Sequence, residues 1–318
     1  MKQLNWGIIG AGVISHQFCQ DMPFVNNGKV LAVAARQIES AKKFAEQYQI
    51  ERSYGGYQQL FEDPDIDVVY IATPHTFHYQ NTYDALMAGK SVLCEKPFTV
   101  SEEESKALAK LAKKKGLFLM EAMWTYFLPV LKEAKQWVEQ GRIGQLKHIK
   151  ADFGYPLPYD PSRREWDAKL AGGCLLEMGI YPIAIAQYFT AKLMEIKHVE
   201  ASLADNGVEE DVVILAKADE VKLTLATSFK CKLQNWAYII GDQGYIAIPN
   251  FWRANECMLY QLDQCVDHFA DPRQSLGFNF EAQAVGDAII NDQIEEPAIP
   301  LSISHALQKQ MEQIKAQF

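Results

Sequence analysis

A carboxylate, an amine and a proline follow one apolar segment of this 318-residue sequence. Residues 92–98 read VLCEKPF, so Glu95, Lys96 and Pro97 come directly after a stretch typical of a buried strand. A partly desolvated lysine loses its proton more easily and can polarise a substrate oxygen. A turn on the surface would also account for an exposed lysine. The positions of the predicted strands and turns around Lys96 distinguish a functional lysine from a lysine on a surface turn.

A glycine turn near the start of the chain is of the kind that binds a pyrophosphate. Residues 7–15 read GIIGAGVIS and follow an apolar segment. Glycines here let the backbone turn tightly and approach phosphates, while the start of the next helix supplies N–H groups and positive potential. Ser15 stands where a third glycine or an alanine is usual, and it is small enough to keep the helix packed on the strand. The predicted dinucleotide contacts of this turn are Gly10, Gly12, Val13 and Ile14.

The end of the second predicted strand bears on the choice of cofactor. NAD sites place an acid there for the ribose 2′-hydroxyl, whereas NADP sites use an arginine for the 2′-phosphate. In this chain the strand ends in Ala35, and Arg36 follows it. A guanidinium binds phosphate well, and alanine does not repel it. The sequence favours NADP over NAD, and the alternative is that Arg36 is only a solvated surface residue.

Two further strand ends carry polar residues that the fold should bring to the edge of the glycine turn. One is ATPHTFH at residues 72–78, and the other is the segment with Lys96. Ligands of a doubly wound sheet bind beyond the carboxyl ends of its strands. The two histidines have the spacing of a metal pair without an evident third ligand, so His78 is interpreted as a loop or helix cap. The cofactor contacts predicted from these strand ends are Thr73, Pro74, His78, Glu95, Lys96 and Pro97.

The order of elements predicts an α/β chain with two domains. Short apolar runs alternate with helical patterns up to about residue 120, which is typical of a parallel sheet. A long apolar helix over residues 172–190 and a block rich in β-branched and aromatic residues over 194–262 follow. We therefore predict a Rossmann domain with a doubly wound parallel sheet at residues 1–121. An α+β domain with a mostly antiparallel sheet should occupy residues 122–318.

Composition narrows the classes of function. Hydrophobic residues make up 48% and charged residues 22%, as in ordinary soluble globular proteins. The net charge of -9 argues against a general nucleic-acid binder and against docking on anionic membranes. The six cysteines contain no CxxC pair, and no apolar run reaches the ~20 residues of a membrane-spanning helix. We expect reduced cysteines in a cytoplasmic protein that acts on a small molecule.

Several segments together resemble one known family. GIIGAG, ATPHTFH and AGKSVLCEKPF, in this order and spacing, are similar to the Gfo/Idh/MocA family of oxidoreductases. MEAMWTYFLP, IGQLKHIKADFG and AGGCLLEMGIYP extend the resemblance to the branch of dimeric dihydrodiol dehydrogenase and NADP-linked D-xylose dehydrogenases. The resemblance implies a Rossmann domain, a second α/β domain with an open, mostly antiparallel sheet, and NAD(P) in the cleft between them. It also implies a homodimer formed through that second sheet.

The resemblance implies roles for single residues as well. Lys96 would contact the reacting hydroxyl and the nicotinamide ribose, Pro97 would follow a cis peptide bond, and Tyr181 would be the acid/base. Glu177 lies four residues before Tyr181, so both share one face of a helix, although a buried tyrosine often serves only the core. The chain departs from the branch at Glu177, where aspartate is usual, and at Tyr126, where arginine is usual. The predicted substrate-binding residues are Trp124, Tyr126 and Trp166.

These observations combine into one hypothesis with two rivals. Hydride would pass between the nicotinamide and a hydroxyl-bearing carbon of a sugar or cyclic diol. Lys96 would lower the pKa of the hydroxyl, and Tyr181 would exchange its proton with help from Glu177. Arg163 or Arg164 could supply the cation that the branch usually has near the substrate. The rivals are an NAD-linked polyol or inositol-type dehydrogenase and a non-enzymatic NADP-binding regulator on the same fold.

Overall fold

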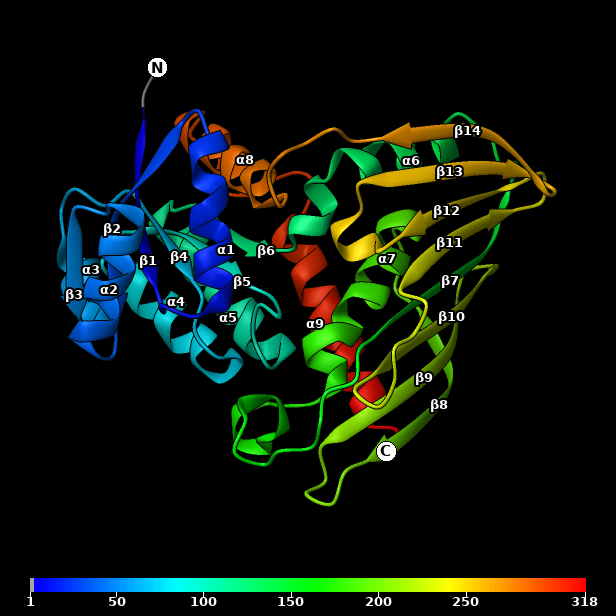
Figure 1. The fold of residues 1–318 in the computed structure, drawn as a ribbon, viewed down its shortest axis with the longest axis horizontal. Helices are drawn as coiled ribbons and strands as arrows, with labels where there is room; N and C mark the ends of the chain where they lie inside the picture. Colours follow the sequence, from blue (N-terminus) through cyan, green and yellow to red (C-terminus); the bar gives the residue numbers. More distant parts are fainter. Residues whose placement is uncertain (1–2) are drawn as a thin grey trace. The chain divides into compact units, whose positions relative to one another are not determined.

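The computed structural model describes residues 3–318, which form two compact units (Figure 1). Of the described residues, the first unit contains 3–124 and 274–305, and the second contains 125–273 and 306–318. The division predicted between residues 121 and 122 lies close to the first of these boundaries. Residues 274–305, which the sequence division grouped with the C-terminal half, pack with the N-terminal unit. The assignment of one domain to the cofactor and the other to the substrate stays a prediction.

The first unit is built on a six-stranded parallel sheet in the order β3-β2-β1-β4-β5-β6. The order reverses between β1 and β4, and such a switch point is where doubly wound sheets bind ligands. The predicted Rossmann sheet is confirmed. The short, polar strand β3 was not predicted. The strands are β1 (Leu4–Ile9), β2 (Gly28–Ala35), β3 (Arg52–Gly55), β4 (Val68–Ile71), β5 (Ser91–Glu95) and β6 (Leu119–Ala122).

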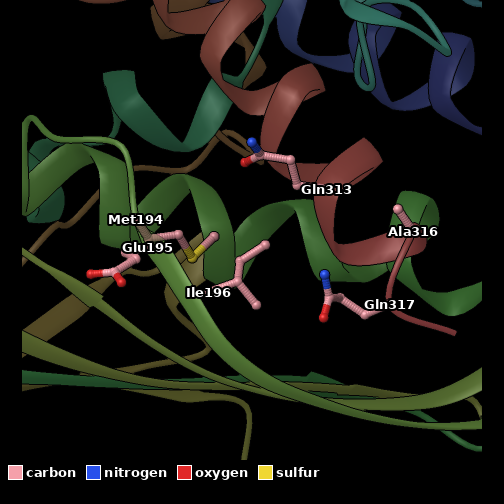
Figure 2. A pocket seen from close by; sticks show the side chains of 6 residues that line it. All are labelled: Met194, Glu195, Ile196, Gln313, Ala316 and Gln317. Atoms are coloured by element: carbon pink, nitrogen blue, oxygen red, sulfur yellow. The ribbon is translucent and has the colours of Figure 1, made fainter.

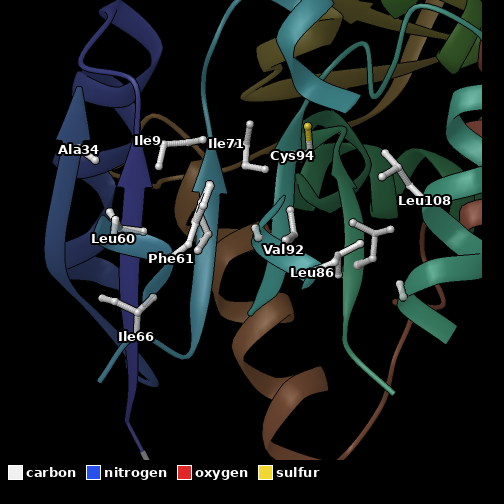
Figure 3. Packing of buried hydrophobic residues seen from close by; sticks show 14 of the residues in the cluster. Ile9, Ala34, Leu60, Phe61, Ile66, Ile71, Leu86, Val92, Cys94 and Leu108 are labelled. Atoms are coloured by element: carbon white, nitrogen blue, oxygen red, sulfur yellow. The ribbon is translucent and has the colours of Figure 1, made fainter. Parts of the chain in front are cut away.

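Helices pack on this sheet through a continuous apolar core. Leu60, Leu86 and Leu108 meet Ile71 and Val92 of the sheet in one buried cluster (Figure 3). Removing such a buried leucine side chain typically costs about 2–5 kcal/mol of folding free energy, so the cluster holds the strand ends in place. The helices of this unit are α1 (Val13–Asp21), α2 (Ile38–Tyr48), α3 (Tyr57–Glu62), α4 (His78–Met87), α5 (Glu102–Lys115) and α8 (Phe278–Ile290).

The boundaries of α5 follow directly from its sequence. The Ser101 hydroxyl oxygen accepts a hydrogen bond from the Glu104 backbone N–H at 3.2 Å, as predicted for an N-cap. Three acids occupy the first turn and three lysines the last, and both groups complement the helix dipole. Gly116 ends the helix in the left-handed conformation with φ 65°, which glycine adopts without steric cost.

The second unit contains an eight-stranded sheet in the order β14-β13-β12-β11-β7-β10-β9-β8. Within the described residues, β7 and β10 are the only neighbouring strands of this sheet that run parallel. The other neighbouring pairs are antiparallel, so the predicted mostly antiparallel sheet is confirmed. The strands are β7 (Leu146–Gly154), β8 (Glu195–Leu203), β9 (Glu209–Ala218), β10 (Val221–Ser228), β11 (Trp236–Gly241), β12 (Tyr245–Pro249), β13 (Glu256–Gln261) and β14 (Gln264–Ala270).

The two faces of this second sheet differ. Helices α6 (Pro129–Glu139) and α7 (Ile180–Thr190) cover one face, and α9 (Leu301–Lys315) ends the chain (Figure 1). Along β9, Val212 and Ile214 are buried, whereas Val213 and Leu215 are 41% and 43% exposed. This period-two alternation is expected for a sheet with one open face.

The helix predicted over residues 172–190 is not α-helical throughout. Leu175–Gly179 form a π-helical turn, and α7 begins only at Ile180. Pro182 has no N–H, and in an α-helix its ring would clash with the carbonyl of Met178. Widening the preceding turn relieves that conflict and ends the regular hydrogen-bonding pattern. The structure therefore adds a local irregularity between Glu177 and Tyr181.

One helical stretch in the described part of the chain, residues 168–190, is long and apolar enough to cross a membrane. Its most apolar window is 78% buried within the protein. A core helix that packs on a sheet meets the same criteria of length and composition, and this burial is the pattern expected of one.

Candidate functional site

The glycine turn after β1 has the shape that a dinucleotide needs. Gly10 adopts φ 95°, and a Cβ atom there would lie 2.5 Å from the carbonyl oxygen of Ala72. Glycine is therefore required where the turn passes the loop after β4. At Gly12 an added Cβ would meet no atom within 4 Å, so this backbone is open to a ligand. The tight turn at Gly10 and the open space beside the Gly12 backbone together leave room for a pyrophosphate to approach the main chain.

The start of α1 also suits an anion. Gly12 is the N-cap and offers no side-chain hydrogen bond, and no acidic residue lies in the first turn. Val13 is exposed and Ile14 half-buried. Ser15 is fully buried, and its hydroxyl donates a hydrogen bond to the carbonyl oxygen of Gly10 at 2.7 Å. Serine thus closes the turn internally in place of the usual third glycine, and the helix dipole remains available to phosphate.

Arg36 lies at the position that the sequence predicts for recognition of a 2′-phosphate. It directly follows Ala35, the buried last residue of β2, and its side chain is exposed. Burial raises the pKa of the Tyr57 phenol, and the positive charge of Arg36 opposes that rise. Within residues 3–318 no carboxylate forms an ion pair with Arg36. The binding of a phosphate by this guanidinium stays a prediction.

His78 joins the loops after β4 and β5. It is fully buried at the start of α4, with Nε2 2.8 Å from the carbonyl oxygen of Thr73 and Nδ1 2.8 Å from that of Pro97. Both partners accept hydrogen bonds, so both contacts are satisfied together only when each ring nitrogen carries a proton. Asn81 donates to the Thr73 hydroxyl at 2.9 Å, and Pro74 is half-buried beside it. The predicted cofactor residues Thr73, Pro74, His78 and Pro97 thus lie in one connected region.

Lys96 is held at the end of β5 by its neighbours. The buried carboxylate of Glu95 accepts hydrogen bonds from the Tyr70 hydroxyl at 2.5 Å and from the Lys96 backbone N–H at 3.1 Å. The Lys96–Pro97 peptide bond is cis, as the resemblance implied. The Lys96 side chain is half-buried. The lysine is therefore not on a loose surface turn but at the sheet edge that carries the glycine turn.

Tyr181 and Glu177 belong to the second unit. Tyr181 is 7% exposed, and its ring packs edge-to-face on Phe153 with centroids 5.6 Å apart. Glu177 forms a two-point ion pair with Arg164, through Nη1 to Oε1 and through Nη2 to Oε2 at 3.2 Å. The side chain of Glu177, which is longer than the aspartate usual at this position, thus reaches the guanidinium of Arg164 in the preceding loop. Sequence spacing did not predict this pair, because the two residues are joined by irregular chain.

The three predicted substrate-binding residues are largely buried. Trp124, in the first unit, stacks on Phe278 with centroids 4.4 Å apart and an interplanar angle of 2°. In the second unit, the Tyr126 hydroxyl donates to the carbonyl oxygen of Ala184 at 2.7 Å, and Trp166 Nε1 donates to that of Pro158 at 3.1 Å. These contacts fix the orientations of the three rings. Their binding role stays a prediction.

A separate pocket of about 340 Å³ opens beside β8 and the end of α9 (Figure 2). None of the predicted site residues lines it. Its one charged side chain, Glu195, pairs with Lys197 and also lies 3.7 Å from Lys217. The pocket is lined by Met194, Glu195, Ile196, Gln313, Ala316 and Gln317.

Sequence reasoning missed a set of buried acids in the first unit. Glu121 on β6 is fully buried and accepts a hydrogen bond from the Phe98 backbone N–H at 2.9 Å. Burial raises the pKa of Glu121 to about 7, against the opposing charge of Lys96. Glu281 on α8 is also fully buried. The sequence did contain one signal of the buried Glu281, because this acid stands on the apolar stripe of α8 between Phe278 and Val285.

Both halves of the chain match models of one family. Residues 4–123 match the Gfo/Idh/MocA oxidoreductase family with its NAD-binding Rossmann fold, and residues 131–247 match the Gfo/Idh/MocA C-terminal domain. The chain belongs to the Gfo/Idh/MocA oxidoreductase family. It is an NAD(P)-dependent oxidoreductase. The family that the EKP segment suggested is thereby confirmed.

Individual relatives and solved structures cover nearly the whole chain. Trans-1,2-dihydrobenzene-1,2-diol dehydrogenases from Mus musculus and Homo sapiens are 32% and 33% identical and align over 98% of this chain and 96% of their own. A 3-ketoreductase from Actinomadura kijaniata, solved with NADP and TDP-benzene, has a TM-score of 0.90 at 24% identity over 99% of this chain and 98% of its own. An aldose-aldose oxidoreductase from Caulobacter crescentus has a TM-score of 0.89 at 22% identity over 99% and 97%. At these identities the two structures establish the shared fold.

Proposed function

We propose that this chain is an NADP-dependent oxidoreductase that transfers hydride between nicotinamide and a hydroxyl-bearing carbon of a sugar or cyclic diol. The observation that carries the proposal is the placement of Lys96. It directly follows β5, on the same sheet edge as the glycine turn, and its backbone N–H donates a hydrogen bond to the buried carboxylate of Glu95. The half-buried amine of Lys96 in that position fits a contact with a reacting hydroxyl better than it fits the side chain of an ordinary surface turn.

The substrate class is supported by what the relatives are named for. The mouse and human relatives are dehydrogenases of a cyclic trans-diol, and the two solved structures are a 3-ketoreductase and an aldose-aldose oxidoreductase. All of these names describe oxidation or reduction at carbon bonded to oxygen. A cyclic diol and a cyclic sugar both present a ring carbon that bears a hydroxyl beside a second hydroxyl.

The preference for NADP is supported by Arg36. A guanidinium that follows the last residue of β2 can bind a 2′-phosphate through two hydrogen bonds, whereas NAD offers it only a hydroxyl. The solved 3-ketoreductase complex contains NADP. The residues proposed to hold the cofactor are Gly10, Gly12, Val13, Ile14, Arg36, Thr73, Pro74, His78, Glu95, Lys96 and Pro97.

We assign three residues to the chemistry. Bound nicotinamide supplies the hydride acceptor or donor. The Lys96 ammonium donates a hydrogen bond to the substrate hydroxyl, which stabilises negative charge on that oxygen and lowers its pKa. Tyr181 exchanges the hydroxyl proton. Glu177, with its charge balanced by Arg164, orients the segment that carries Tyr181.

The open face of the second sheet supports a homodimer. Tyr245 and Tyr260 stack there with centroids 4.8 Å apart, and Tyr238 lies 6.3 Å from Tyr245. Val213 and Leu215 add exposed apolar surface on the same face. A patch of aromatic and aliphatic residues on one face is typical of a protein interface. Sedimentation velocity should show that Leu215→Glu dissociates the dimer, while Leu262→Glu on a hairpin tip leaves it intact.

A reducing compartment is supported by the cysteines. The six of the described chain are all free thiols, and Cys19, Cys94, Cys174 and Cys257 are buried. Structural disulfides form and persist in oxidising compartments. We therefore assign the protein to the cytoplasm, and fractionation of the source cells is the corresponding test.

The experiment that tests the function measures cofactor reduction. Purified protein is given NADP⁺ or NAD⁺ with a panel of aldoses, polyols and trans-dihydrodiols, and NADPH binding is measured separately by fluorescence. We expect turnover with NADP⁺ that is lost in Lys96→Ala and kept in the exposed control Lys110→Ala. Turnover with NAD⁺ and rejection of NADP⁺ would favour the polyol dehydrogenase. NADPH binding without turnover of any substrate would favour the regulator.

A further inference from the structure

Glu121 is a completely buried acid for which the proposed mechanism has no use. It lies on β6, where it pairs with Cys94 of β5 across the sheet. Its Oε1 accepts a hydrogen bond from the Phe98 backbone N–H at 2.9 Å, and Phe98 is also fully buried. Burial of a carboxyl group is costly, so leucine or methionine would suit this strand better if packing were the only demand. Packing alone therefore does not explain an acid at this place.

Phe98 ends a three-residue segment that begins with Lys96. Pro97 has no N–H, so the backbone donors of this segment are those of Lys96 and Phe98. Oε2 of Glu95 accepts from the first donor at 3.1 Å, and Oε1 of Glu121 accepts from the second at 2.9 Å. Both backbone donors of the segment thus bind the side chains of buried glutamates.

The carbonyl groups of the segment are held as well. Nδ1 of His78, at the start of α4, lies 2.8 Å from the Pro97 carbonyl oxygen, and the Cys94 thiol donates to the Phe98 carbonyl oxygen at 3.8 Å. Groups from β5, β6 and α4 therefore bind the backbone around Lys96. Such precision matters for a reacting group, because a displacement of about 1 Å can slow a reaction by about 10²-fold.

We propose that Glu121 is a positioning residue for Lys96. Its hydrogen bond to the Phe98 N–H fixes the far end of the segment, while Glu95 fixes the near end, so the Lys96 side chain leaves the sheet from one defined place. Glu121 offers an acceptor oxygen whether it is protonated or ionised, so this positioning does not need its charge. The inference rests on the proposed role of Lys96.

Three variants separate the hydrogen bond from charge and from stability. Glu121→Gln keeps an oxygen that can accept from the Phe98 N–H, and it cannot ionise. Glu121→Met keeps a side chain of similar length and has no oxygen. Asp63→Asn is the control for stability, because Asp63 is a buried acid that binds Arg52 at 2.9 Å in the loop before β4, at the opposite edge of the sheet.

Three measurements are made on the purified wild type and on each variant. Hydrogen exchange resolved to single residues reports the protection of the Phe98 amide. Trace acetylation, quantified by mass spectrometry of peptides, reports the reactivity of Lys96 relative to the exposed Lys110. Steady-state kcat with NADP⁺ and the dissociation constant of NADPH report function. The first two measurements need no substrate.

We expect the Phe98 amide to exchange slowly in the wild type and in Glu121→Gln, and about tenfold faster in Glu121→Met. Lys96 should be acetylated faster in Glu121→Met alone, because the released segment gives its amine more access to solvent. The kcat should stay within about threefold of the wild type in Glu121→Gln and fall about 10–100-fold in Glu121→Met. NADPH affinity should change by less than about threefold, because the predicted phosphate contacts lie at other strand ends. Asp63→Asn should lower the unfolding temperature and leave kcat unchanged.

Several results would overturn the proposal. Unchanged kcat and unchanged Lys96 acetylation in Glu121→Met would mean that Glu121 does not position Lys96. A loss of kcat in Glu121→Gln as large as in Glu121→Met would mean that the charge matters and the acceptor does not. An equal loss in Asp63→Asn would trace the effect to stability. Fast exchange of the Phe98 amide in the wild type would refute the hydrogen bond even if no variant folds.

The proposed function can fail separately from this inference. A wild type that binds NADPH and turns nothing over would refute the function by itself. Exchange of the Phe98 amide and acetylation of Lys96 would then still accept or reject the positioning role of Glu121.

Discussion

The two sheets of this protein present their polar residues in different ways. The parallel sheet of the first unit is covered on both faces, so polar side chains gather where the strands end, at Arg36, Thr73 and Lys96. The mostly antiparallel sheet of the second unit alternates buried and more exposed residues along strands such as β9 and β11. Its predicted chemistry lies instead on a helix, at Tyr181, after a π-helical turn. The predicted functional residues thus follow strand ends in the first unit, whereas in the second unit they lie at a local irregularity of a helix.

The largest effect is expected at Tyr181. Tyr181→Phe removes the hydroxyl proposed to exchange the substrate proton and should lower kcat by about 10²–10⁴-fold. The ring packing on Phe153 is preserved, so the unfolding temperature should change little. Steady-state kinetics measure the effect, and Tyr159→Phe, at an exposed tyrosine, is the control variant. A kcat equal to that of the wild type would remove the second unit from the chemistry.

The buried acid of β6, Glu121, should make the stability of the protein fall as the pH rises from about 4.5 to about 7. The folded pKa of Glu121 is about 7 against 4.5 for the free group, so its contribution to stability is present below pH 4.5 and is lost as the pH rises through 7. Glu121→Gln cannot ionise and should gain up to about 3 kcal/mol relative to the wild type by pH 8, with no gain at pH 4. Urea unfolding at several pH values measures this, and exposed Glu103→Gln is the control. A gain that is independent of pH would show that Glu121 is not protonated on folding.

Cofactor discrimination should depend on the end of β2. Arg36→Ala should weaken NADPH binding by about 10–100-fold, because a charge-assisted hydrogen bond contributes about 1.5–3 kcal/mol. NADH binding should stay unchanged, since NADH has no 2′-phosphate. Fluorescence titration of both cofactors measures this, beside the exposed control Arg163→Ala. An equal loss of affinity for NADPH and NADH would mean that Arg36 supports the fold of the turn and does not bind the 2′-phosphate.

The π-helical turn should have the smallest effect of the four. Pro182→Ala restores a backbone N–H and lets an α-helical turn replace Leu175–Gly179. Glu177 and Tyr181 would then change their relative direction, and kcat should fall about tenfold with NADPH binding intact. A crystal structure of the variant together with its kinetics provides the test. An α-helical turn with full activity would separate the irregularity from function.

Much of the fold could be predicted from the sequence, because regular elements repeat their apolar residues at fixed intervals. The strands β1, β2, β4 and β5 and the helix α5 carried such patterns and clear end signals. Strand β3 was missed because RSYG is short and polar. Strand β14 was missed because all of its residues remain partly or fully exposed. Elements held in place mainly by pairing to a neighbour leave little trace in a single sequence.

The site was less completely predictable. Glycine turns and strand ends have local signatures, so candidate residues of the first unit could be proposed from their order, and their roles stay predictions. The ion pair of Arg164 with Glu177 joins irregular segments, and no spacing rule gives it. The burial of Glu281 depends on how α8 packs, although one acid on an apolar stripe was visible. The π-helical turn depends on the response of a whole helix to Pro182.

The most direct test of the account follows one hydrogen atom. A substrate found to turn over is prepared with deuterium on the reacting carbon and given to wild type and Lys96→Ala with NADP⁺. Nuclear magnetic resonance of the reduced cofactor then shows where the label has gone. We predict deuterium on the nicotinamide ring with the wild type and almost none with Lys96→Ala, at cofactor concentrations that saturate both proteins. A reduced cofactor without deuterium, or equal labelling by the variant, would contradict hydride transfer at a site organised by Lys96.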